Sequence, residues 1–356
     1  MRVLALVPSQ KGHSPGQRGS VELWERVLDP AGITMDFAPF ESERLTEILY
    51  KSGHQISKIA ETIRAYVDRI KLLNRLDDYD AVLIYREAAL LGPAFLEKRI
   101  AKRKPLIYQL DDPLFVPYRS PSNGYLSYLK FFSKVREIVR LSEVVIVNSS
   151  GIRQYAEQYN QNIWQIPSVV DQSKFTYIPR AVNDHRVTIG WSGSPTTINN
   201  IKMVRSPLAA ISARGDCDIR LIGSDSFDLP GVSFTAQRWR EQSEVEDLRK
   251  LDVGLVPLPD HPWNPYKFIM KTAQYFALGI VPVGTPLASN LEVIRHGENG
   301  FLAATDEEWT KYLTMLAEDA GLRMRLAEAG VRDAHDHYTL EANRAKIVDA
   351  FQAALR

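Results

Sequence analysis

Two lysines near the start of a predicted helix are the side chains best suited to chemistry in this sequence. Lys267 lies in a loop after Trp263, and Lys271 lies in the first turn of the helix that follows. Their ammonium groups, the N–H groups of the helix N-terminus and the positive end of the helix dipole together favour an anion. Gln274, one turn later, can bond a group next to that anion. The pattern favours a phosphate-bearing small ligand, and the alternative is an ordinary turn with solvated lysines.

Two further segments support a ligand near these lysines. The apolar run from Gly279 to Gly284 predicts a buried strand that opens into the polar residues Thr285–Asn290, and ligands of open α/β sheets bind at such strand ends. Another predicted strand, which begins at Val187, runs into a loop whose N–H and hydroxyl groups can contact a phosphate. That loop has neither the lysine of a P-loop nor the three-glycine dinucleotide fingerprint. We expect it to contribute Ser192, Gly193, Ser194 and Thr196.

The first half of the chain has a comparable glycine-rich loop. Lys11–Ser20 follows the predicted strand Arg2–Val7 and precedes a predicted helix from about Ser20 to Leu28. Because it connects the first strand to the first helix, we expect its Gly16 and Arg18 at the ligand-binding edge of the first sheet.

Charged pairs end two further predicted strands. Asp111 and Asp112 follow the strand Leu106–Leu110, and paired carboxylates can hold Mg²⁺. Adjacent residues at a strand end point to opposite sides, so we expect one to meet a substrate hydroxyl and the other to cap the next turn. Arg86 and Glu87 follow the strand Ala81–Tyr85. For them, a role at the ligand site and a structural ion pair are both open.

Composition excludes several classes of function. The chain of 356 residues carries 44 Lys and Arg against 43 Asp and Glu, so charge gives no reason to expect a nucleic-acid partner. Cys217 is the only cysteine, which excludes a disulfide framework. The seven histidines form no metal-binding pattern, and no Gly-x-Ser-x-Gly motif is present. The start of the chain lacks a signal-peptide core, and no run reaches the roughly twenty apolar residues of a spanning helix. We expect a cytoplasmic protein.

The elements that position these residues form two series of alternating strands and helices, which is typical of parallel sheets covered on both faces. The best linker candidate is the polar stretch Gln172–Arg186. We therefore predict an α/β protein with two Rossmann-like domains facing across a cleft, formed by residues 1–178 and 179–335, and a terminal helical segment, 336–356. Besides the strands above, the predicted strands are Val144–Asn148, Val187–Trp191, Arg220–Gly223, Val253–Pro257 and Ile280–Val283.

One predicted helix, Ile56–Leu73, has an apolar face bordered by basic residues. The apolar face consists of Ile56, Ile59, Ile63, Val67 and Ile70. Such a helix either packs that face into the core and exposes its charged side, or forms a basic amphipathic surface that contacts anionic lipid. The first interpretation is the ordinary one, and the second would place the protein peripherally at the inner face of a membrane.

Several motifs together resemble the GT-B glycosyltransferases, specifically the retaining enzymes of glycosyltransferase family 4, over nearly the whole chain. Within that family a bacterial group that builds glycans and exopolysaccharides is most similar. The motifs are DDPLF (111–115), IGWSGSPTT (189–197), DVGLVPLPD (252–260), KFIMKTAQYFALG (267–279) and EVIRHGENGFL (292–302).

The resemblance implies a nucleotide-diphospho-sugar donor bound mainly by the second domain and an acceptor bound mainly by the first. Of the two glutamates that mark the family, the one that holds the ribose corresponds to Gln274 and the one that contacts the sugar corresponds to Tyr266. The basic diphosphate clamp falls near Ser194 and Asn200, so Lys267 and Lys271 are its expected substitutes. Further donor-binding positions are Gly16, Arg18, Gly223, Trp239, Phe268 and Met270, with the base against Ala236–Trp239.

On the acceptor side, the resemblance places Asp111 where the family has a catalytic-site histidine, with Arg86, Glu87 and Asp112 beside it. Leaving group and acceptor would react on one face of the sugar, and the diphosphate would take the acceptor proton. Such a reaction needs electrostatic stabilisation and no metal or other cofactor. The acceptor would be a glycan, a lipid-linked sugar or a small molecule, and the last helix would return to the first domain.

Two other functions remain open. Because both signature glutamates and the histidine are replaced, the chain can be a non-catalytic protein that binds nucleotide sugars or glycans. An epimerase on the same fold is a third possibility. The sequence names neither the base, the sugar and the acceptor nor the oligomeric state.

Overall fold

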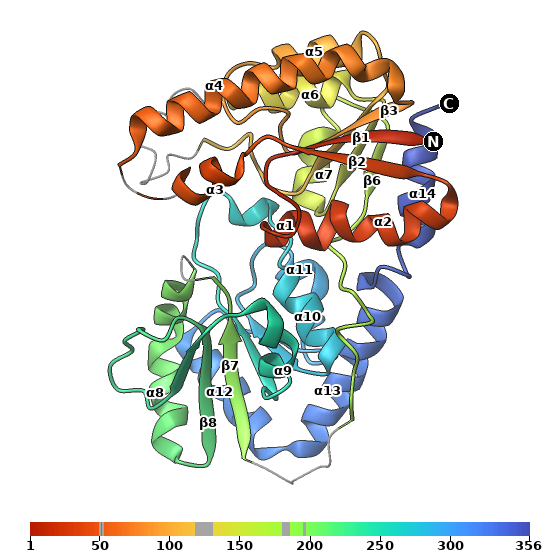
Figure 1. Cartoon of the computed structure of the whole chain (residues 1–356). Coiled ribbons are helices and arrows are strands. Elements are labelled where there is room, and N and C mark those ends of the chain that lie inside the picture. The colour runs from red at the N-terminus through yellow and green to blue at the C-terminus, as the bar shows by residue number, and fades with distance from the viewer. Residues whose placement is uncertain (50, 52, 118–130, 180–185, 195–196) are drawn as a thin grey trace. The chain divides into compact units, whose positions relative to one another are not determined.

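The computed structural model describes residues 1–49, 51, 53–117, 131–179, 186–194 and 197–356. It contains two parallel six-stranded sheets, so the predicted α/β architecture is confirmed (Figure 1). The chain forms two compact units. The first unit comprises residues 1–168, 266–268 and 343–356, and the second comprises residues 169–265 and 269–342. No helix in the described part of the chain is long and apolar enough to cross a membrane.

The sheet of the first unit has the order β2-β1-β3-β4-β5-β6. Its strands are β1 (Arg2–Val7), β2 (Thr34–Pro39), β3 (Ala81–Tyr85), β4 (Leu106–Leu110), β5 (Val144–Val147) and β6 (Ile163–Gln165). Every residue of β3, β4 and β5 is buried, as expected for parallel strands covered on both faces. Because such strands are continuous apolar runs, their positions were predicted to within one residue.

Helices cover both faces of this first sheet (Figure 1). They are α1 (Pro15–Gln17), a π-helical turn (Arg18–Glu22), α2 (Leu23–Leu28), α3 (Glu43–Leu49), α4 (Gln55–Leu72), α5 (Phe95–Ala101), α6 (Lys134–Leu141), α7 (Ser150–Ala156) and α14 (Arg344–Ala353). Short 3-10 turns are Asp29–Ala31 and Leu73–Asp78; a third, Asn264–Tyr266, has its first two residues in the second unit and its last in the first.

The sheet of the second unit has the order β12-β11-β10-β7-β8-β9. Its strands are β7 (Val187–Ser192), β8 (Cys217–Gly223), β9 (Thr235–Arg238), β10 (Val253–Val256), β11 (Val281–Gly284) and β12 (Phe301–Leu302). The helices are α8 (Arg205–Arg214), α9 (Glu244–Leu248), α10 (Met270–Leu278), α11 (Asn290–Val293), α12 (Asp306–Glu318) and α13 (Ala320–Asp333). Shorter turns are Ile198–Val204, Glu241–Ser243 and Ala334–Tyr338.

The last helix belongs to the first unit. The ring of Phe351 on α14 meets that of Trp24 on α2 edge to face, with centroids 6.2 Å apart, and both residues are buried. The returning segment of the first unit begins at Asn343, and the first stretch of that unit ends at Ser168. The sequence-based end of the first domain, residue 178, lies ten residues after Ser168, and the sequence-based start of the terminal segment, residue 336, lies seven residues before Asn343.

The first helical segment starts earlier than predicted. It begins at Pro15, not near Ser20, and continues through a π-helical turn to Leu28. Gly16 and Arg18 therefore lie on a helix and not on the preceding loop. Gly16 and Gly19 disfavour a helix locally, so a loop was predicted here. Pro15 indicates the true start, because proline is common at the first position of a helix. The buried Gln17 holds the loop by bonding the carbonyl of Ser9 at 2.9 Å.

Helix α4 faces its neighbours with its charged side, so the interpretation that its apolar face packs in the core is wrong. Lys58, Glu61 and Arg69 are buried, whereas the five apolar residues of the predicted face are exposed. Arg69 explains this orientation, since its guanidinium donates to the carbonyls of Ala88 at 2.9 Å, Ala38 at 2.6 Å and Val7 at 2.9 Å. These carbonyls lie at or just after the ends of β3, β2 and β1.

Candidate functional site

In the second unit, Lys271 lies in the first turn of α10 as predicted. Its Nζ is 4.4 Å from the centroid of the Trp191 ring, and Trp191 is almost fully buried near the end of β7. A cation over the face of a tryptophan gains about 0.5–2 kcal/mol from the ring quadrupole. The ammonium is thereby held beside the helix N-terminus, where the backbone dipole adds to its attraction for an anion.

Two glycines allow the backbone to approach Trp191. A Cβ on Gly193 would lie 2.5 Å from the indole and 3.0 Å from Lys271 Nζ, and a Cβ on Gly223 would lie 2.7 Å from the Gly193 carbonyl oxygen. Only glycine fits these positions without movement of the backbone or the ring. The ends of β7 and β8 therefore form a tight floor under Lys271.

The loop after β7 offers fewer N–H groups to a phosphate than expected. Gly193 N–H donates to the Ile222 carbonyl at 2.9 Å, and Ser192 N–H donates to the buried Tyr275 hydroxyl at 3.3 Å. Burial raises the pKa of that tyrosine, so the hydroxyl stays neutral. Thr196 lies outside the described residues. This part of the phosphate-site prediction is wrong for the N–H groups of Ser192 and Gly193, because sheet and helix neighbours already bond them.

The start of α10 is fixed by buried polar groups from the loop after β11. Ile269 N–H donates to Ser289 Oγ at 2.7 Å. Asn290 is fully buried and donates to the carbonyls of Val256 at 3.3 Å and Thr285 at 3.0 Å. Through these bonds the ends of β10 and β11 set the position of the helix turn that carries Met270 and Lys271.

Glu244 carries a carboxylate that was not predicted from the sequence and that contacts two predicted donor-binding residues. Glu244, the first residue of α9, accepts hydrogen bonds from Trp239 Nε1 at 3.1 Å and from Gln274 Nε2 at 3.4 Å. The two predicted donor-binding residues Trp239 and Gln274 are thus connected through one acidic side chain. In the sequence, Glu244 is marked only by its position five residues after Trp239, and this gives no reason to prefer Glu244 over the neighbouring acidic residues.

In the first unit, Asp111 forms a buried ion pair with Arg86. Arg86 Nε lies 2.7 Å from Asp111 Oδ1 and Arg86 Nη2 lies 2.9 Å from Asp111 Oδ2, which makes the pair bidentate. The Tyr85 hydroxyl donates to the same carboxylate at 2.6 Å. Gly16 packs over this group, since a Cβ there would lie 3.0 Å from both Arg86 Nη2 and the Tyr85 hydroxyl.

Both aspartates contact Arg86, so the expectation that they point to opposite sides of the strand end is wrong, whereas the expected contact of one of them with a substrate hydroxyl stays a prediction. Arg86 Nη2 also lies 2.6 Å from Asp112 Oδ2. Arg86 is in the left-handed conformation, with φ of 65°, which brings its side chain back over the strand end. Such a conformation is costly for a residue with a Cβ and occurs often at functional sites. Burial by itself would lower the pKa of Arg86, but the two carboxylates outweigh it and raise the pKa.

Glu87 forms a structural ion pair, the second of the two interpretations left open for it. Its carboxylate lies 3.2 Å from Lys134 Nζ, and the Lys134 side chain is only 1% exposed. Lys134 also donates to the Ala89 carbonyl at 2.6 Å and lies 3.8 Å from the buried Glu97. The contacts bind α5 and α6 to the strand end. They leave Glu87 without a direct place in the group around Asp111.

Two predicted donor-binding residues and one predicted catalytic lysine belong to the first unit. Tyr266, Lys267 and Phe268 are part of it, whereas Lys271 is part of the second. The Tyr266 carbonyl accepts a hydrogen bond from Ser149 Oγ, and its ring meets that of Phe115 edge to face, with centroids 4.9 Å apart. Tyr266 therefore packs in an aromatic cluster, where the resemblance expects a carboxylate.

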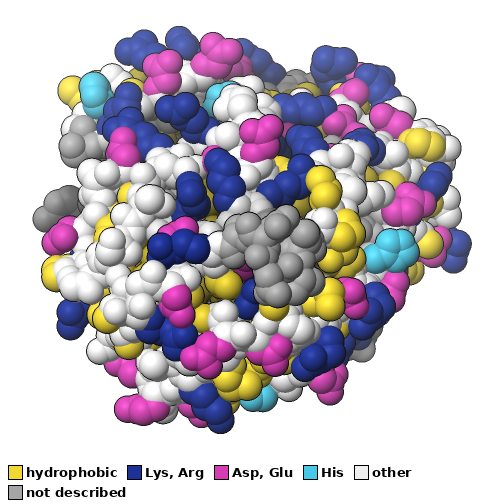
Figure 2. Space-filling view, turned by 90° about the horizontal axis from the view of Figure 1, so that it is seen from below, with side chains coloured by type: hydrophobic (Ala, Val, Ile, Leu, Met, Phe, Trp, Pro, Cys, Tyr) yellow, Lys and Arg dark blue, Asp and Glu magenta, His cyan; other side chains and the backbone are white. Residues whose placement is uncertain are grey.

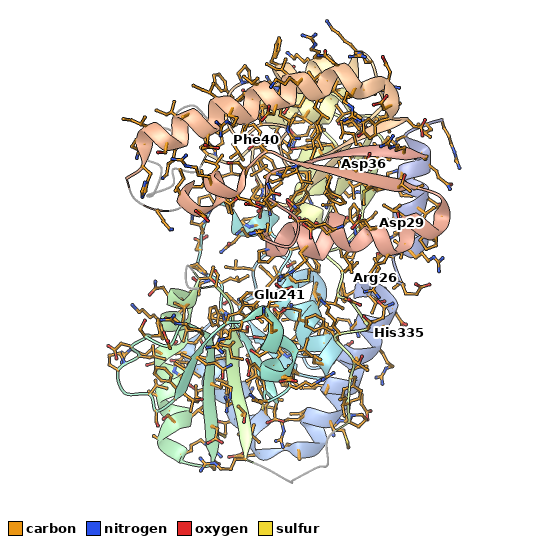
Figure 3. All side chains as sticks on the ribbon, in the orientation of Figure 1. Arg26, Asp29, Asp36, Phe40, Glu241 and His335 are labelled. Atoms are coloured by element: carbon orange, nitrogen blue, oxygen red, sulfur yellow. The ribbon has the colours of Figure 1, made fainter. Side chains whose placement is uncertain are left out.

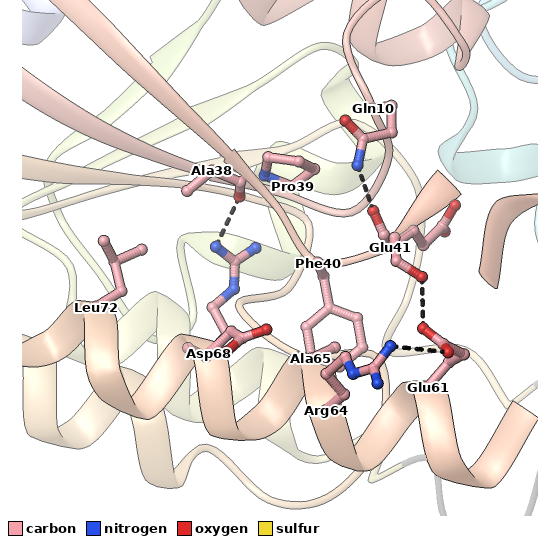
Figure 4. Close-up of a pocket in the computed structure, with 12 residues that line it drawn as sticks. Gln10, Ala38, Pro39, Phe40, Glu41, Glu61, Arg64, Ala65, Asp68 and Leu72 are labelled. Carbon is pink, nitrogen blue, oxygen red and sulfur yellow. Dashed lines mark hydrogen bonds and ion pairs between the residues drawn. The ribbon is translucent and has the colours of Figure 1, made fainter. Parts of the chain in front are cut away.

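A cavity of about 340 Å³ lies at the carboxyl ends of β1 and β2, against α4 (Figure 4). Phe40 points from the end of β2 toward α4 (Figure 3) and meets Tyr66 edge to face. Glu41 lines the cavity, and burial raises its pKa even though Thr46 and Ser9 donate to it. Glu61 accepts from Ser42 Oγ at 2.8 Å. The cavity thus offers carboxylates and hydroxyls beside an apolar wall.

Surface charge gives no competing site on the face drawn in Figure 2, where Lys and Arg side chains are interspersed with Asp and Glu. Among the described residues, no group of three or more His, Cys, Asp or Glu side chains is arranged to hold a metal ion.

Comparisons with known proteins find similarity in structure only. No protein-family model matches the chain, and no curated protein sequence matches it. Sucrose-phosphate synthase of Thermosynechococcus elongatus is 14% identical with a TM-score of 0.70, covering 99% of this chain and 98% of its own. Anabaena HepE in complex with UDP and glucose is 14% identical with a TM-score of 0.67, covering 99% and 100%. A glycosyltransferase of Rickettsia africae is 14% identical with a TM-score of 0.69, covering 100% and 98%. The chain therefore has the two-unit α/β fold of the GT-B glycosyltransferases.

Proposed function

We propose that the protein is a glycosyltransferase that moves a sugar from a nucleotide-diphospho-sugar to an acceptor hydroxyl. The observation that carries the proposal is Lys271, held over Trp191 at the N-terminus of α10. A helix N-terminus with an adjacent ammonium suits the diphosphate of such a donor. The likeness to HepE, which is described in complex with UDP-glucose, supports this type of ligand.

The nucleoside would lie next to Trp239, Gln274 and Glu244. Glu244 Oε1 already accepts from both neighbours, and the rest of its carboxylate can accept from ribose hydroxyls. Gln274 has no charge at the position where the resemblance expects a glutamate. Glu244 would supply that charge from α9.

Transfer would break the bond between the anomeric carbon and a phosphate oxygen and form a bond from that carbon to the acceptor oxygen. The acceptor proton would pass to the departing diphosphate, and both events would occur on one face of the sugar, with retention. Charge develops on the diphosphate during this step, so Lys271 and the α10 dipole would stabilise the transition state more than the ground state. Lys267 is proposed as a second cation for the same group. No divalent metal or other cofactor is required by this scheme.

The acceptor would bind to the first unit, near the Arg86–Asp111 pair and the cavity beside α4. The carboxylates of Glu41 and Glu61 and the hydroxyl of Ser42 line that cavity and can bond a polyhydroxylated molecule. A glycan, a lipid-linked sugar or a small sugar fits this chemistry. We place the reaction in the cytoplasm, in the assembly of a bacterial glycan or glycoconjugate.

Thermal unfolding with UDP-, GDP-, dTDP- and ADP-sugars tests the proposal. A ligand at 100 times its Kd adds about 2.7 kcal/mol to the free energy of unfolding, so one nucleotide should raise the melting temperature measurably. The sugar nucleotide that stabilises the protein is then incubated with candidate acceptors, and transfer is followed by mass spectrometry. Failure of all four nucleotides to stabilise the protein would contradict the proposal.

A second candidate function is binding of nucleotide sugars or glycans without transfer. Tyr266 favours it, because this ring packs on Phe115 at the position where the resemblance expects a sugar-binding carboxylate. Stabilisation by one nucleotide sugar without transfer or hydrolysis would support this function instead.

A further inference from the structure

Helix α4 exposes a continuous apolar ridge, formed by Ile56, Ile59, Ile63, Val67 and Ile70. Their exposed fractions are 84%, 47%, 59%, 44% and 44%. The residues are spaced three or four apart, so they line one side of the helix over most of its length. Single exposed apolar side chains are common on soluble proteins, whereas an ordered row of five large aliphatic residues marks an interaction surface.

The ridge cannot turn inward, because the opposite side of the helix is fixed by buried polar contacts. Arg69 donates to carbonyls at the ends of three strands, and Lys58 Nζ donates to the Lys51 carbonyl at 2.7 Å. Rolling α4 to bury its isoleucines would remove these bonds and expose the buried acceptors to apolar surroundings, at a cost for each unpaired group. The outward direction of the ridge is therefore a stable property of the fold.

Cations border the ridge. The side chains of Arg64 and Lys71 are each 71% exposed. Lys71 pairs with the exposed Asp68 at 3.4 Å, and such surface pairs are weak, so this one can be exchanged for a phosphate group. Arg64 lies 3.3 Å from the buried Glu61, and because the arginine side chain itself stays exposed, it can contact a phosphate without leaving that pair. Lys51 adds positive charge before the helix, and Asp68 is the one exposed acid within α4. Beyond the end of α4, Arg75 pairs with Asp78 at 3.3 Å and Asp77 is exposed, so the positive charge is concentrated along the helix itself. The exposed side of α4 is thus aliphatic along its centre and basic along its flank.

These features fit a lipid surface better than a protein partner. Protein interfaces concentrate their binding energy in Trp, Tyr and Arg that fill pockets, and a standard interface buries about 800 Å² on each side. The ridge has no aromatic anchor and consists of one helix roughly 27 Å long. An interfacial helix, in contrast, needs an aliphatic face bordered by Lys and Arg and enters the boundary between headgroups and acyl chains.

We propose that α4 lies flat on a bilayer that contains anionic lipids, with the ridge in the acyl boundary and Arg64 and Lys71 at the lipid phosphates. The cavity beside α4 is lined by Arg64 and Asp68 as well, so it would open next to the headgroups (Figure 4). If the proposed transfer function holds, this arrangement selects an acceptor whose hydroxyls are carried by a lipid. The membrane contact itself does not depend on that function.

Sedimentation with vesicles tests the proposal without any nucleotide sugar. The full chain is mixed with vesicles of phosphatidylcholine alone or with added phosphatidylglycerol, and the bound fraction is measured. We expect binding to the anionic vesicles that weakens with salt. The affinity of the variant Ile56→Ser/Ile63→Ser/Ile70→Ser for these vesicles should fall by at least about tenfold, because three aliphatic side chains no longer insert into the bilayer. Arg64→Glu/Lys71→Glu should lose the preference for anionic lipid.

Matched controls keep the result interpretable. Leu291→Ser/Met315→Ser/Met324→Ser removes three apolar side chains that are 57%, 36% and 43% exposed on the second unit and should leave vesicle binding unchanged. Circular dichroism and the melting temperature show whether each variant is folded. Absence of binding to either vesicle, or equal binding by wild type and ridge variant, would overturn the proposal. So would a dimer in sedimentation velocity that the ridge variant abolishes, since the ridge would then join two copies of the chain.

Discussion

The ammonium of Lys271 lies 4.4 Å from the centroid of the Trp191 ring, which couples the first turn of α10 to the end of β7. The indole has a second role, because its edge sets the space above Gly193 and Gly223. One tryptophan therefore positions a cation and limits the backbone beside it. A change at any of these four residues should alter the position of the ammonium group.

Replacement of Lys271 by Ala should lower kcat and raise KM. The ammonium would contact a diphosphate that gains charge as it leaves, so its removal affects the transition state more than the ground state. Loss of one such stabilising group costs about 10²-fold in rate, by comparison with oxyanion donors. Steady-state kinetics with the identified donor measures this. Lys311→Ala, which removes an exposed lysine beside Tyr312, is the control, and equal kinetics in both variants would refute the role of Lys271.

Gln274 and Glu244 should act together in nucleotide binding. Gln274→Ala should weaken the affinity by about 0.5–1.5 kcal/mol, the net value of one hydrogen bond. Glu244→Ala should cost more, because a carboxylate makes charge-assisted bonds with ribose hydroxyls. Calorimetric titration of the two single variants and the double variant gives the coupling energy. Strictly additive effects would show that the 3.4 Å contact between the two side chains has no part in the site.

Transfer activity should survive EDTA. Both aspartates after β4 already contact the guanidinium of Arg86, and the proposed leaving group is met by lysine and a helix N-terminus. We expect the same initial rate with EDTA and with added Mg²⁺. Complete loss of activity that Mg²⁺ restores would return Asp111 and Asp112 to the role of metal ligands.

Asp111→Ala should destabilise the first unit strongly. The change leaves Arg86 and the Tyr85 hydroxyl without their shared partner, and breaking a buried ion pair costs about 3–5 kcal/mol. The lower end of that range applies, because the Arg86 side chain is 26% exposed and keeps its contact with Asp112 at 2.6 Å. Asp36→Ala breaks an ion pair with Arg2 in which both side chains are 42% or more exposed, and it should cost at most about 1 kcal/mol. Denaturant unfolding compares the two, and equal losses would contradict a buried role for Asp111.

Glu41→Gln should stabilise the protein at neutral pH. Burial raises the pKa of Glu41 in the folded state, so the ionised form is the costly one. Below the pKa of the unfolded chain, Glu41 is protonated in both states and this cost vanishes; it is fully present once the pH exceeds the folded pKa. The gain from Gln should therefore be largest near pH 7 and shrink as the pH falls toward 4. Exposed Glu318→Gln serves as the control, and a gain independent of pH would rule out this cause.

The sequence predicted the limits of β1, β3 and β4 but not the presence of β2, β6, β9 and β12. β3 and β4 are buried throughout and β1 is buried from Val3 onward, which only a few conformations satisfy, so their limits were correct to the residue. The start at Pro15 was missed because Gly16 and Gly19 weigh against a helix locally. Gly16 is retained there for a tertiary reason, its contact with Arg86 and Tyr85, and no local pattern carries that information.

In the candidate site, too, local features could be predicted from the sequence, whereas contacts between distant residues could not. Lys271 could be placed from the sequence because its position depends on one helix start. The partners of Asp111 could not, because the ion pair depends on the left-handed φ of Arg86, which a sequence pattern does not encode. Glu244 was missed for a related reason, since its contact with Gln274 joins α9 to a residue of α10 that lies 30 positions later in the chain.

Arg69 has a consequence for how the chain tolerates substitution. Its guanidinium spans the ends of three strands with three separate N–H groups, a geometry that the single ammonium of lysine cannot reproduce. Substitution of any of the five ridge residues therefore leaves the same side of α4 exposed. Substitution of Arg69 would remove the bonds that fix the orientation of the helix about its axis. The surface chemistry of α4 can drift while its orientation stays anchored, so relatives of this chain could acquire different surfaces on an unchanged scaffold.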